Sequence, residues 1–593
     1  MSGKNIIKGQ LEQAEPVEDE GFGLYGNAAN DHRHGDDGAQ PDAGDDGSNE
    51  RGHELGMLTP EEMDNLRVCA ELDQNDRDNG RRLIIWYGLD LSYVPGMGWL
   101  LFNGNHWERD EADLAVRLKA QDLVDWIKRE VWFIEPTPGV RRLIALADKI
   151  ALKPIADRTG EEIDVLNKSL EARKALSKKR SARRTFGVSS GNSGKTDAML
   201  KQAASRKATN PELLDKDKKL FNVQNGTLKF SRVEDEESDP DDPRYVGRCE
   251  LVEHDRSHMI TKTADVTFDP KAECPRWIEF LEQMQPDEDI RTFLQVSHGF
   301  ALLVGGNDAQ KLFYHYGGGA NGKSVFIETI GRMAGPYRAV VDPATITGDS
   351  QRDGSKANSD VARLVSTRLA TIEELPRDVP LKENLIKALT GGTRMVARFL
   401  QKEIFEFDPE FVAVMSGNDM PTVSGTDYGI WRRLLIIHWA VTIPLEKQRL
   451  FGEMLAMFDE ERSGILNWLI EGVKLYLANG LTPYIPRSVT QFTDDYREER
   501  DPVGTFAAAC LAPKPGGKIN AGDMHAQFEK WCQANGIKPY QQTAFGRRMN
   551  SLGFKKKRGS HVDYLDVIFV NLTDKFDPRE DERPEPPLPE GEM

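Results

Sequence analysis

The chain has 593 residues, too many for one hydrophobic core, so its length predicts several domains. Hydrophobic residues make up 39% and charged residues 29%, as in globular proteins, and no apolar run is long enough to cross a bilayer. The N-terminus lacks the apolar core of a signal peptide, so we expect a cytoplasmic protein with no membrane partner. The five cysteines form no C-x-x-C pair, which argues against a structural zinc site.

The net charge of −18 is concentrated at the two ends of the chain. Residues 1–55 carry thirteen acids and four bases, a net of −9, and residues 574–593 carry eight acids and three bases, a net of −5. Both ends contain few large apolar residues, so we predict disordered acidic tails at 1–55 and 573–593. The body between them is nearly neutral and can therefore hold local basic patches.

The first ordered element is expected near Leu58, where Thr59 suits the N-cap of a helix and Pro60 its first turn. Asn225-Gly226, between two apolar runs, predicts a β-hairpin. From residue 312 to about 440, apolar strands alternate with helices, which predicts an α/β fold with a largely parallel sheet. The other expected elements are strands within 81–110, helices at 113–130 and 140–180, an acidic loop at 232–245, helices at 276–304 and 446–480, and three helices followed by two strands at 502–572.

A complete phosphate-loop motif, G-x-x-x-x-G-K-[ST], follows the strand-like run 312–316. Its glycines let backbone N–H groups surround phosphates, its lysine reaches the β- and γ-phosphates, and its serine hydroxyl ligates Mg²⁺. The helix expected after the motif presents its N-terminus to the anion. The motif therefore predicts binding of ATP with Mg²⁺ by Gly317, Gly318, Gly319, Ala320, Asn321, Gly322, Lys323 and Ser324.

A shorter match upstream, residues 191–196, is not assigned to nucleotide. Ser189 stands where its first motif glycine is required, no apolar strand precedes it, and its flanks are polar and basic. We interpret this segment as a loop between helices.

Hydrolysis also needs a carboxylate for the metal and a group that orients water. The apolar run 369–372 ends in Glu373 and Glu374. Because successive strand residues point to opposite faces, we assign Glu373 to the Mg²⁺ shell and Glu374 to the attacking water. A second apolar run ends near Asn418, which we interpret as a contact to the water or the γ-phosphate, although Gly417-Asn418-Asp419 is also good turn sequence.

Two adjacent arginines, Arg432 and Arg433, precede the apolar run 434–437. An arginine delivered to the γ-phosphate of a neighbouring subunit stabilises the transition state and is worth about 10³–10⁵ in rate in related enzymes. We favour Arg433 for this role, with Arg432 second. The sequence does not separate the two arginines, and a surface ion pair is the alternative.

Taken in order, GGGANGKS, TIEEL, LTGGTRMVARFLQK, SGND and WRRLLII resemble the motifs of superfamily 3 helicases, most of all the phage and plasmid primase–helicase group with its poxvirus-type relatives. The resemblance covers about residues 58–572. It implies an AAA+-like P-loop ATPase core at 276–485, a preceding mostly helical α+β domain at 56–275, and a C-terminal winged helix at 495–572. It also implies an ATP-dependent DNA helicase of phage or plasmid replication in a bacterial host cell. Such helicases are usually homo-hexameric rings that thread one DNA strand, and replication proteins are possible partners.

The resemblance further implies a loop that projects into the channel of the ring, here residues 387–402. Independently of the family, Arg394, Arg398 and Lys402 are four residues apart, so in a helix they share one face suited to a phosphate backbone. Together with Lys387 they are the candidate contacts to single-stranded DNA.

In the C-terminal unit we expect helices at 521–534 and 541–552, the second ended by Gly553. A basic helix followed by a basic hairpin suits contact with duplex DNA, while a solvated hairpin or a protein-docking module is the alternative. The candidate contacts are Arg547, Arg548, Lys555, Lys556, Lys557 and Arg558. A further basic cluster within 173–184 fits either DNA contact or a solvated helix face.

Other functions compete with the helicase interpretation. A primase domain needs about 200 residues with clustered carboxylates, and only the predicted tail precedes Leu58, so we expect no N-terminal primase domain. An origin-binding or loading protein that uses ATP only as a switch needs neither two adjacent carboxylates nor an arginine finger. A packaging motor is a weaker alternative, because nothing resembles a nuclease domain.

Overall fold

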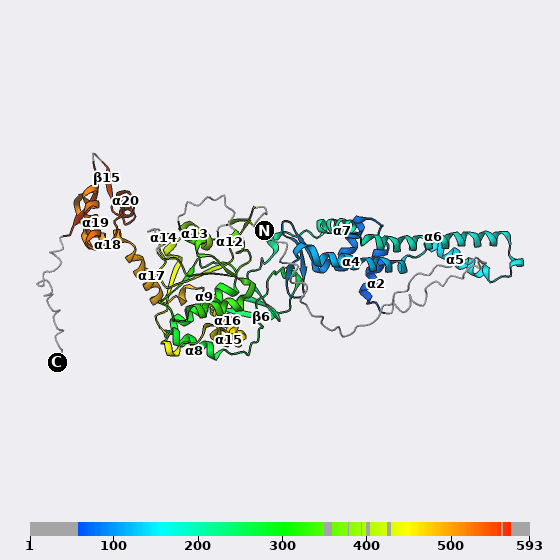
Figure 1. Cartoon of the computed structure of the whole chain (residues 1–593), viewed down its shortest axis with the longest axis horizontal. Helices are drawn as coiled ribbons and strands as arrows, with labels where there is room; N and C mark the ends of the chain where they lie inside the picture. The colour runs from blue at the N-terminus through cyan, green and yellow to red at the C-terminus, as the bar shows by residue number, and fades with distance from the viewer. Residues whose placement is uncertain are drawn as a thin grey trace, which may run out of the picture. The chain divides into compact units, whose positions relative to one another are not determined.

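The structure is a computed structural model that describes residues 57–348, 359–377, 379–392, 394–398, 404–423, 428–558 and 561–570 (Figure 1). The chain divides into two units, residues 1–63 and 64–593. In the first unit, the side chains of Thr59 and Glu62 cap each other's backbone N–H groups where α2 (Pro60–Ala70) begins, which confirms the predicted cap. Both predicted acidic tails lie outside the described residues.

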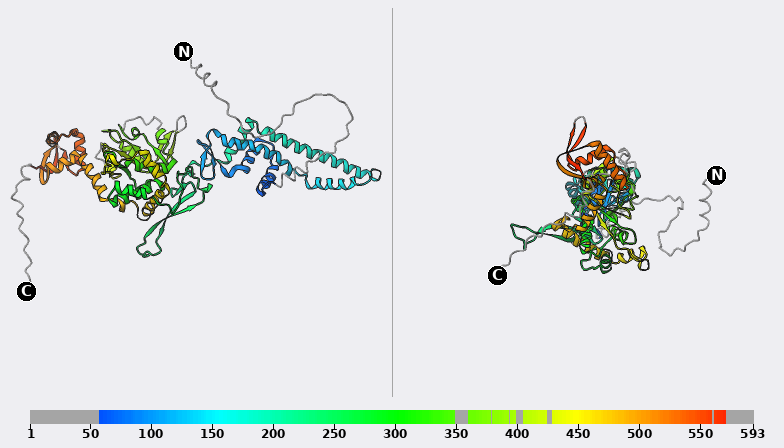
Figure 2. Two further views of the ribbon diagram at one scale, coloured as in Figure 1. Left: turned by 60° about the horizontal axis from the view of Figure 1, so that its bottom comes forward. Right: turned by 90° about the vertical axis from the view of Figure 1, so that its left-hand side faces the viewer.

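The part of the second unit before residue 210 is mostly helical. A small antiparallel sheet, β1-β2-β3, lies between the helices. The helices expected at 113–130 and 140–180 are present, the second as α5 and the 31-residue α6, which pack along each other (Figure 2). Residues 81–87, expected to be extended, instead complete a helix. The bounds are α3 (Asp76–Tyr87), β1 (Leu91–Val94), β2 (Gly98–Phe102), β3 (Trp107–Arg109), α4 (Leu114–Arg129), α5 (Pro138–Ala151), α6 (Gly160–Ser190) and α7 (Ser193–Arg206).

A second antiparallel sheet has the order β4-β5-β6, with bounds Leu220–Val223, Gly226–Glu234 and Tyr245–Val252. The predicted hairpin is confirmed, because Val223 pairs with Gly226 across the turn. A Cβ at Gly226 would lie 2.6 Å from the carbonyl oxygen of Val252, so this turn requires glycine. β5 and β6 form a long antiparallel pair (Figure 2). The acidic loop, predicted at 232–245, is therefore shorter and covers residues 235–244.

The core sheet has five parallel strands in the order β13-β7-β12-β9-β8. It confirms the predicted parallel α/β fold. Its elements are β7 (Leu312–Tyr316), α10 (Lys323–Ala334), β8 (Arg338–Val340), α11 (Pro343–Ile346), α12 (Ser359–Ala362), β9 (Leu369–Glu373), α13 (Glu383–Thr390), β12 (Val412–Gly417), α14 (Tyr428–Trp431) and β13 (Leu434–His438).

Alternate residues of these strands are buried in two separate cores, one on each face of the sheet. On one face, Phe313, Leu369 and Val414 pack with α10 and with the helices expected at 276–304 and 446–480. On the other face, Tyr314, Ile372 and Met415 pack with α11 to α14 and with Tyr496 of α17. The remaining helices are α8 (Pro275–Met284), α9 (Glu288–Leu303), α15 (Phe451–Asp459), α16 (Arg462–Asn479) and α17 (Arg487–Glu499).

The C-terminal unit contains the three predicted helices and two predicted strands, together with a further strand between its first two helices. The extra strand, β14, is at one edge of an antiparallel sheet of order β14-β16-β15. Its LAPKPGGKIN sequence has few β-branched residues and a bulge between Pro513 and Lys518, which explains why the pattern did not predict it. The bounds are α18 (Pro502–Cys510), β14 (Leu511–Asn520), α19 (Ala521–Ala534), α20 (Gln542–Ser551), β15 (Lys556–Arg558) and β16 (Val562–Phe569).

No helix among the described residues is long and apolar enough to span a membrane.

Candidate functional site

The phosphate-loop motif joins β7 to α10, which is the strand–loop–helix arrangement that the sequence predicts. Gly322 has a φ of +82°, and a Cβ there would lie 2.9 Å from side-chain atoms of Phe280 and Met284 in α8. The loop therefore needs glycine at this position, where α8 packs closely against it. Because α10 begins at Lys323, its first backbone N–H groups are available to an anion.

The ammonium group of Lys323 is held in a cradle of neutral oxygens. It donates to the carbonyl of Gly317 at 2.6 Å, to Oδ1 of Asn321 at 3.1 Å and to Oδ1 of Asn418 at 3.2 Å. The side chain is 4% exposed, and burial lowers the pKa of Lys323. A buried cation whose three acceptors carry no formal charge favours the arrival of an anion such as phosphate.

Parallel pairing brings the other predicted residues to the same edge of the sheet. β12 lies between β7 and β9, with Gly417 opposite Tyr316 and Ser416 opposite Glu373. The carboxyl ends of parallel strands meet at one edge, where ligands bind in open α/β sheets. Asn418 thus follows the central strand between the phosphate loop and the acidic pair, and its bond to Lys323 joins β12 to α10.

The two adjacent carboxylates have different surroundings. Glu373 is the last residue of β9, is 41% exposed, and accepts a hydrogen bond from Arg338 at 3.1 Å. Glu374 is exposed, has a φ of +57°, and donates its backbone N–H to the carbonyl of Ser416 at 3.0 Å. Two carboxylates in different surroundings are compatible with the two predicted roles, which remain predictions.

The residues at this edge suit a magnesium ion bound with phosphates. Mg²⁺ prefers oxygen ligands and keeps several waters when it binds with a nucleotide. The hydroxyl of Ser324, which is exposed in the first turn of α10, and the half-exposed carboxylate of Glu373 supply such donors. These are the two residues that we predict to hold the metal.

The two arginines before β13 differ in burial. Arg433 is 8% exposed and donates to the carbonyl of Gly429 at 2.6 Å within its own turn. Arg432 is exposed, and its backbone carbonyl accepts a hydrogen bond from the ammonium of Lys311 at 2.6 Å. An arginine that acts on another subunit must reach beyond its own surface, so the geometry favours Arg432 over Arg433 among the two candidates.

Sequence reasoning did not identify a set of buried residues behind the phosphate loop. Trp439, the residue after β13, donates its backbone N–H to Tyr316 at 2.8 Å and accepts from Nδ2 of Asn321 at 3.1 Å. Its indole N–H donates to Nδ1 of His315 at 2.9 Å, and Nε2 of His315 lies 3.1 Å from Nε2 of His298. The only sequence signal was a histidine inside the apolar strand YHY.

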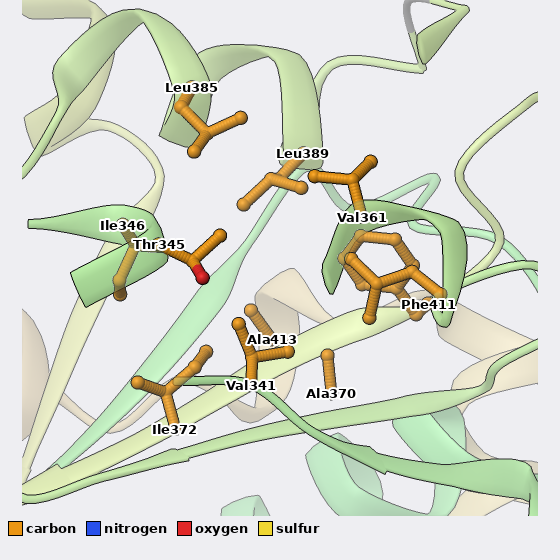
Figure 3. Close-up of a pocket in the computed structure, with 11 residues that line it drawn as sticks. Val341, Thr345, Ile346, Val361, Ala370, Ile372, Leu385, Leu389, Phe411 and Ala413 are labelled. Atoms are coloured by element: carbon orange, nitrogen blue, oxygen red, sulfur yellow. The ribbon is translucent and has the colours of Figure 1, made fainter. Parts of the chain in front are cut away.

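A small apolar cavity lies on the face of the sheet away from α10 (Figure 3). Ten of its eleven lining residues are apolar, and Thr345 is the exception. Ala370 and Ile372 of β9 line it, whereas Glu373 points to the other face. The cavity therefore has neither the position nor the polarity of a nucleotide site.

The segment expected to present basic residues on a helix is a β-hairpin instead. α13 ends at Thr390, and Met395–Arg398 (β10) pairs antiparallel with Ile404–Phe407 (β11). Alternate residues of a strand share one face, whereas residues four apart share a face of a helix, so the helical spacing was coincidental. Arg394 pairs with Glu212 at 3.2 Å and with Asp408 at 3.4 Å.

The side chain of Arg398 and all of Lys402 lie outside the described residues. Lys387 is half-buried in the last turn of α13.

The six basic candidates in the C-terminal unit separate into exposed and engaged side chains. Arg547 of α20 is exposed, as are Lys555 and Lys557. Arg548, by contrast, is 13% exposed and forms an ion pair with Asp501 at 2.5 Å, so the expectation that it contacts DNA is corrected.

Lys556 is engaged as well. It donates to the carbonyl of Gly546 at 2.9 Å and lies 4.8 Å from the ring centroid of Tyr564, so it fastens β15 to α20 rather than facing solvent. The side chain of Arg558 lies outside the described residues.

Two basic features of the helical part are structural. Arg183, in the basic cluster of α6, is 4% exposed and pairs with buried Glu130, so it is not available to DNA. The rejected upstream motif joins two helices, and its Lys195 pairs with Asp76 at 3.1 Å. Both findings arise from contacts across more than fifty residues of sequence, which charge patterns do not reveal.

Two segments of the chain match models of the D5 protein family. Residues 80–286 match the family "D5 N terminal like", and residues 498–577 match "Poxvirus D5 protein-like". They lie on either side of the phosphate-loop core.

Curated relatives match over roughly half of the chain. A putative helicase of Acanthamoeba polyphaga mimivirus is 26% identical over 275 residues, 43% of this chain and 28% of the relative. A putative helicase of Frog virus 3 is 26% identical over 282 residues, 45% of this chain and 29% of the relative. A putative primase of African swine fever virus (strain Badajoz 1971 Vero-adapted) is 21% identical over 343 residues, 55% of this chain and 34% of the relative. The chain thus spans about a third of the length of these relatives or less.

Among solved structures, the C-terminal region of NrS-1 in its apo form aligns with 55% of this chain and 94% of its own, at 11% identity. The TM-score of 0.29 is too low to establish a shared fold. The two family models flank the segment that carries the ATPase motifs, and the mimivirus relative is named as a putative helicase. Over residues 80–286 and 498–577 the chain is thus similar to the D5-type proteins, the group of superfamily 3 helicase–primase proteins that its motifs resemble.

Proposed function

We propose that the chain is an ATP-dependent DNA helicase, a motor that couples ATP hydrolysis to movement on DNA during replication. The observation that carries the proposal is the bond between Lys323 of the phosphate loop and Asn418 at the end of β12, with Glu373 at the end of the adjacent strand. A lysine, an amide and two carboxylates at one sheet edge are the groups that phosphoryl transfer needs.

In this proposal each residue has a defined task. The loop backbone and Lys323 bind the phosphates, and Ser324 and Glu373 hold Mg²⁺, which would neutralise charge on the phosphate oxygens. Glu374 orients and deprotonates the attacking water, while Asn418 holds the γ-phosphate side of the site. Arg432, with Arg433 as the alternative, reaches the site of a neighbouring subunit in a homo-hexamer.

The same proposal covers the contacts with DNA. The β10–β11 hairpin, which carries Arg394 and Arg398, faces the single strand in the channel. The C-terminal unit has the helix, strand, two helices and two strands of a winged helix, and Arg547, Lys555 and Lys557 contact duplex DNA through it. The domain division at 276 and 485–495 and the AAA+-like character of the core belong to the proposal. The phage or plasmid setting rests on motif resemblance alone, and the named relatives are viral.

The test measures ATP hydrolysis with and without single-stranded DNA, together with strand displacement, for wild type and Glu374→Gln. Glu453→Gln, which alters an exposed carboxylate in α15, is the matched control. We expect DNA to stimulate hydrolysis, displacement to accompany it, and Glu374→Gln to abolish both while ATP still binds. Binding of ATP without turnover would contradict the motor proposal and would favour an origin-binding or loading protein that uses ATP as a switch.

A further inference from the structure

Arg338, the first residue of the edge strand β8, connects the acidic strand to the phosphate-loop helix. Its Nε donates to Oγ1 of Thr371 at 2.9 Å, one terminal nitrogen donates to Oε2 of Glu328 at 2.5 Å, and the other donates to Oε1 of Glu373 at 3.1 Å. Thr371 and Glu373 lie on β9, two residues apart, and Glu328 lies on α10. One guanidinium group therefore joins three side chains from two elements.

The surrounding structure is shaped to admit this side chain. Arg338 is 11% exposed, and a Cβ at Gly331 of α10 would overlap its guanidinium. A glycine inside a helix costs about 1 kcal/mol relative to alanine. The absence of a side chain at Gly331 thus leaves the room that Arg338 occupies.

Arg338 bonds to Glu328 on α10, and Ser324 lies on the same face of this helix. Residues four apart in a helix lie one above the other, so Ser324 and Glu328 share a face of α10. By bonding Glu328 and Glu373 at once, Arg338 fixes the distance between the strand end and this face. It engages only Oε1 of Glu373, which leaves Oε2 for another partner.

We propose that Arg338 is a positioning residue that holds the Glu373 carboxylate toward Ser324, so that both are preorganised for a divalent cation bound with the nucleotide. The inference rests on the proposed function, because it takes Ser324 and Glu373 as the metal-holding pair. Residues that orient a metal ligand typically change metal affinity by about 10–100-fold when they are replaced. A guanidinium is suited to this task because its fork of donors is rigid.

The test measures the affinity of a fluorescent ATP analogue in excess Mg²⁺ and in excess EDTA, and takes the ratio as the gain from the metal. For Arg338→Met we expect the affinity in EDTA to stay within about twofold of wild type and the gain from Mg²⁺ to fall by about tenfold. Gly331→Ala should lower the gain in the same direction, because it displaces Arg338 without removing a charge and favours the helix. Arg338→Lys should restore little, since it keeps the charge and loses the fork.

Arg332→Met is the matched control. It removes a cation from α10, the helix that Arg338 contacts, but Arg332 pairs with Asp459 at 2.7 Å and not with Glu373, so the gain from Mg²⁺ should stay at the wild-type value. If wild type gains affinity from Mg²⁺ and Arg338→Met gains as much or more, Arg338 merely neutralises Glu373 and the positioning role is overturned alone. If wild type binds no nucleotide, the proposed function is overturned as well.

Discussion

The indole N–H of Trp439 donates to Nδ1 of His315 at 2.9 Å, and this contact determines the proton positions in a buried histidine pair. Since Nδ1 of His315 accepts, the neutral ring carries its proton on Nε2 and donates to Nε2 of His298. Nδ1 of His298 in turn donates to the carbonyl of Leu294 at 3.0 Å. A proton added to His298 would set two N–H groups against each other at the Nε2 contact, and one added to His315 would set its Nδ1–H against the indole N–H of Trp439.

The pair predicts a loss of stability in mild acid. Burial lowers the pKa of His298 from 6.5 to about 4, and burial with the neighbouring His298 and Lys323 lowers the pKa of His315 well below its ordinary value. The unfolded chain takes up protons below about pH 6.5 while the folded chain does not, so stability is fully present above pH 6.5 and falls as the pH approaches 4. The shift of His298 alone corresponds to about 3 kcal/mol over this range.

Thermal unfolding midpoints at pH 7.5 and pH 5 test this expectation. His298→Gln should make the midpoint less dependent on pH, because glutamine can donate and accept but does not titrate. His561→Gln, which alters an exposed histidine, should leave the dependence as in wild type. An equal pH dependence in wild type and His298→Gln would contradict the assignment.

A buried ion cluster in the helical part predicts a large effect of one substitution. Glu130 is fully buried and pairs with Arg82, at 2.7 Å, and with Arg183. Glu130→Gln leaves two buried guanidinium groups without a counter-charge and should destabilise this part by about 3–5 kcal/mol. Asp148→Asn, which breaks the exposed pair with Arg173, should cost less than about 1 kcal/mol by the same denaturant titration. Similar losses of unfolding free energy in the two variants would show that the buried cluster stabilises the fold no more than the exposed pair does.

The two candidate finger arginines should give different phenotypes. Arg432→Ala should reduce DNA-stimulated hydrolysis by about 10³-fold or more with ATP affinity and thermal stability unchanged. The main effect of Arg433→Ala should be a lower thermal stability rather than a lower rate of hydrolysis, because its guanidinium is buried against the carbonyl of Gly429. Hydrolysis rates, ATP affinity and unfolding midpoints of both variants separate the cases. If Arg433→Ala loses only turnover and Arg432→Ala keeps it, Arg433 is the finger, as the sequence had favoured.

Adjacent arginines in α20 offer a second matched pair. Arg547→Ala should weaken binding to duplex DNA and reduce the slope of log affinity against log salt concentration by about one, with stability unchanged. Arg548→Ala should destabilise the C-terminal unit by about 3 kcal/mol, because Asp501 loses its partner in a largely buried pair. A salt titration of duplex binding and a melting curve on each variant distinguish the two roles. Equal salt slopes for wild type and Arg547→Ala would contradict the proposal that α20 contacts DNA.

Local patterns predicted what depends on local chemistry. The phosphate loop, its flanking strand and helix, and the Asn225-Gly226 turn were predicted because each requires particular residues at fixed spacing. The parallel sheet followed from apolar strands alternating with helices. The pairing of β12 between β7 and β9, which brings Asn418 to Lys323, is a consequence of that topology.

Predictions failed where a long-range contact decides the outcome. Arg394 and Arg398 have helical spacing, yet the segment pairs as a hairpin because Met395 and Ala397 alternate with them and are buried. The burial of Arg183 depends on Glu130, fifty-three residues earlier. Basic runs look alike in sequence whether they face solvent or a partner across the fold.

The strand β13 has the arginine pair at its start and Trp439 directly after its end. Five residues of strand cover about 16 Å, so one stiff element connects the phosphate loop with the segment that carries Arg432. The backbone N–H of Trp439 is bonded to Tyr316, immediately before the loop. Binding of nucleotide to the phosphate loop should therefore slow hydrogen–deuterium exchange along 434–439, although none of these side chains contacts the nucleotide.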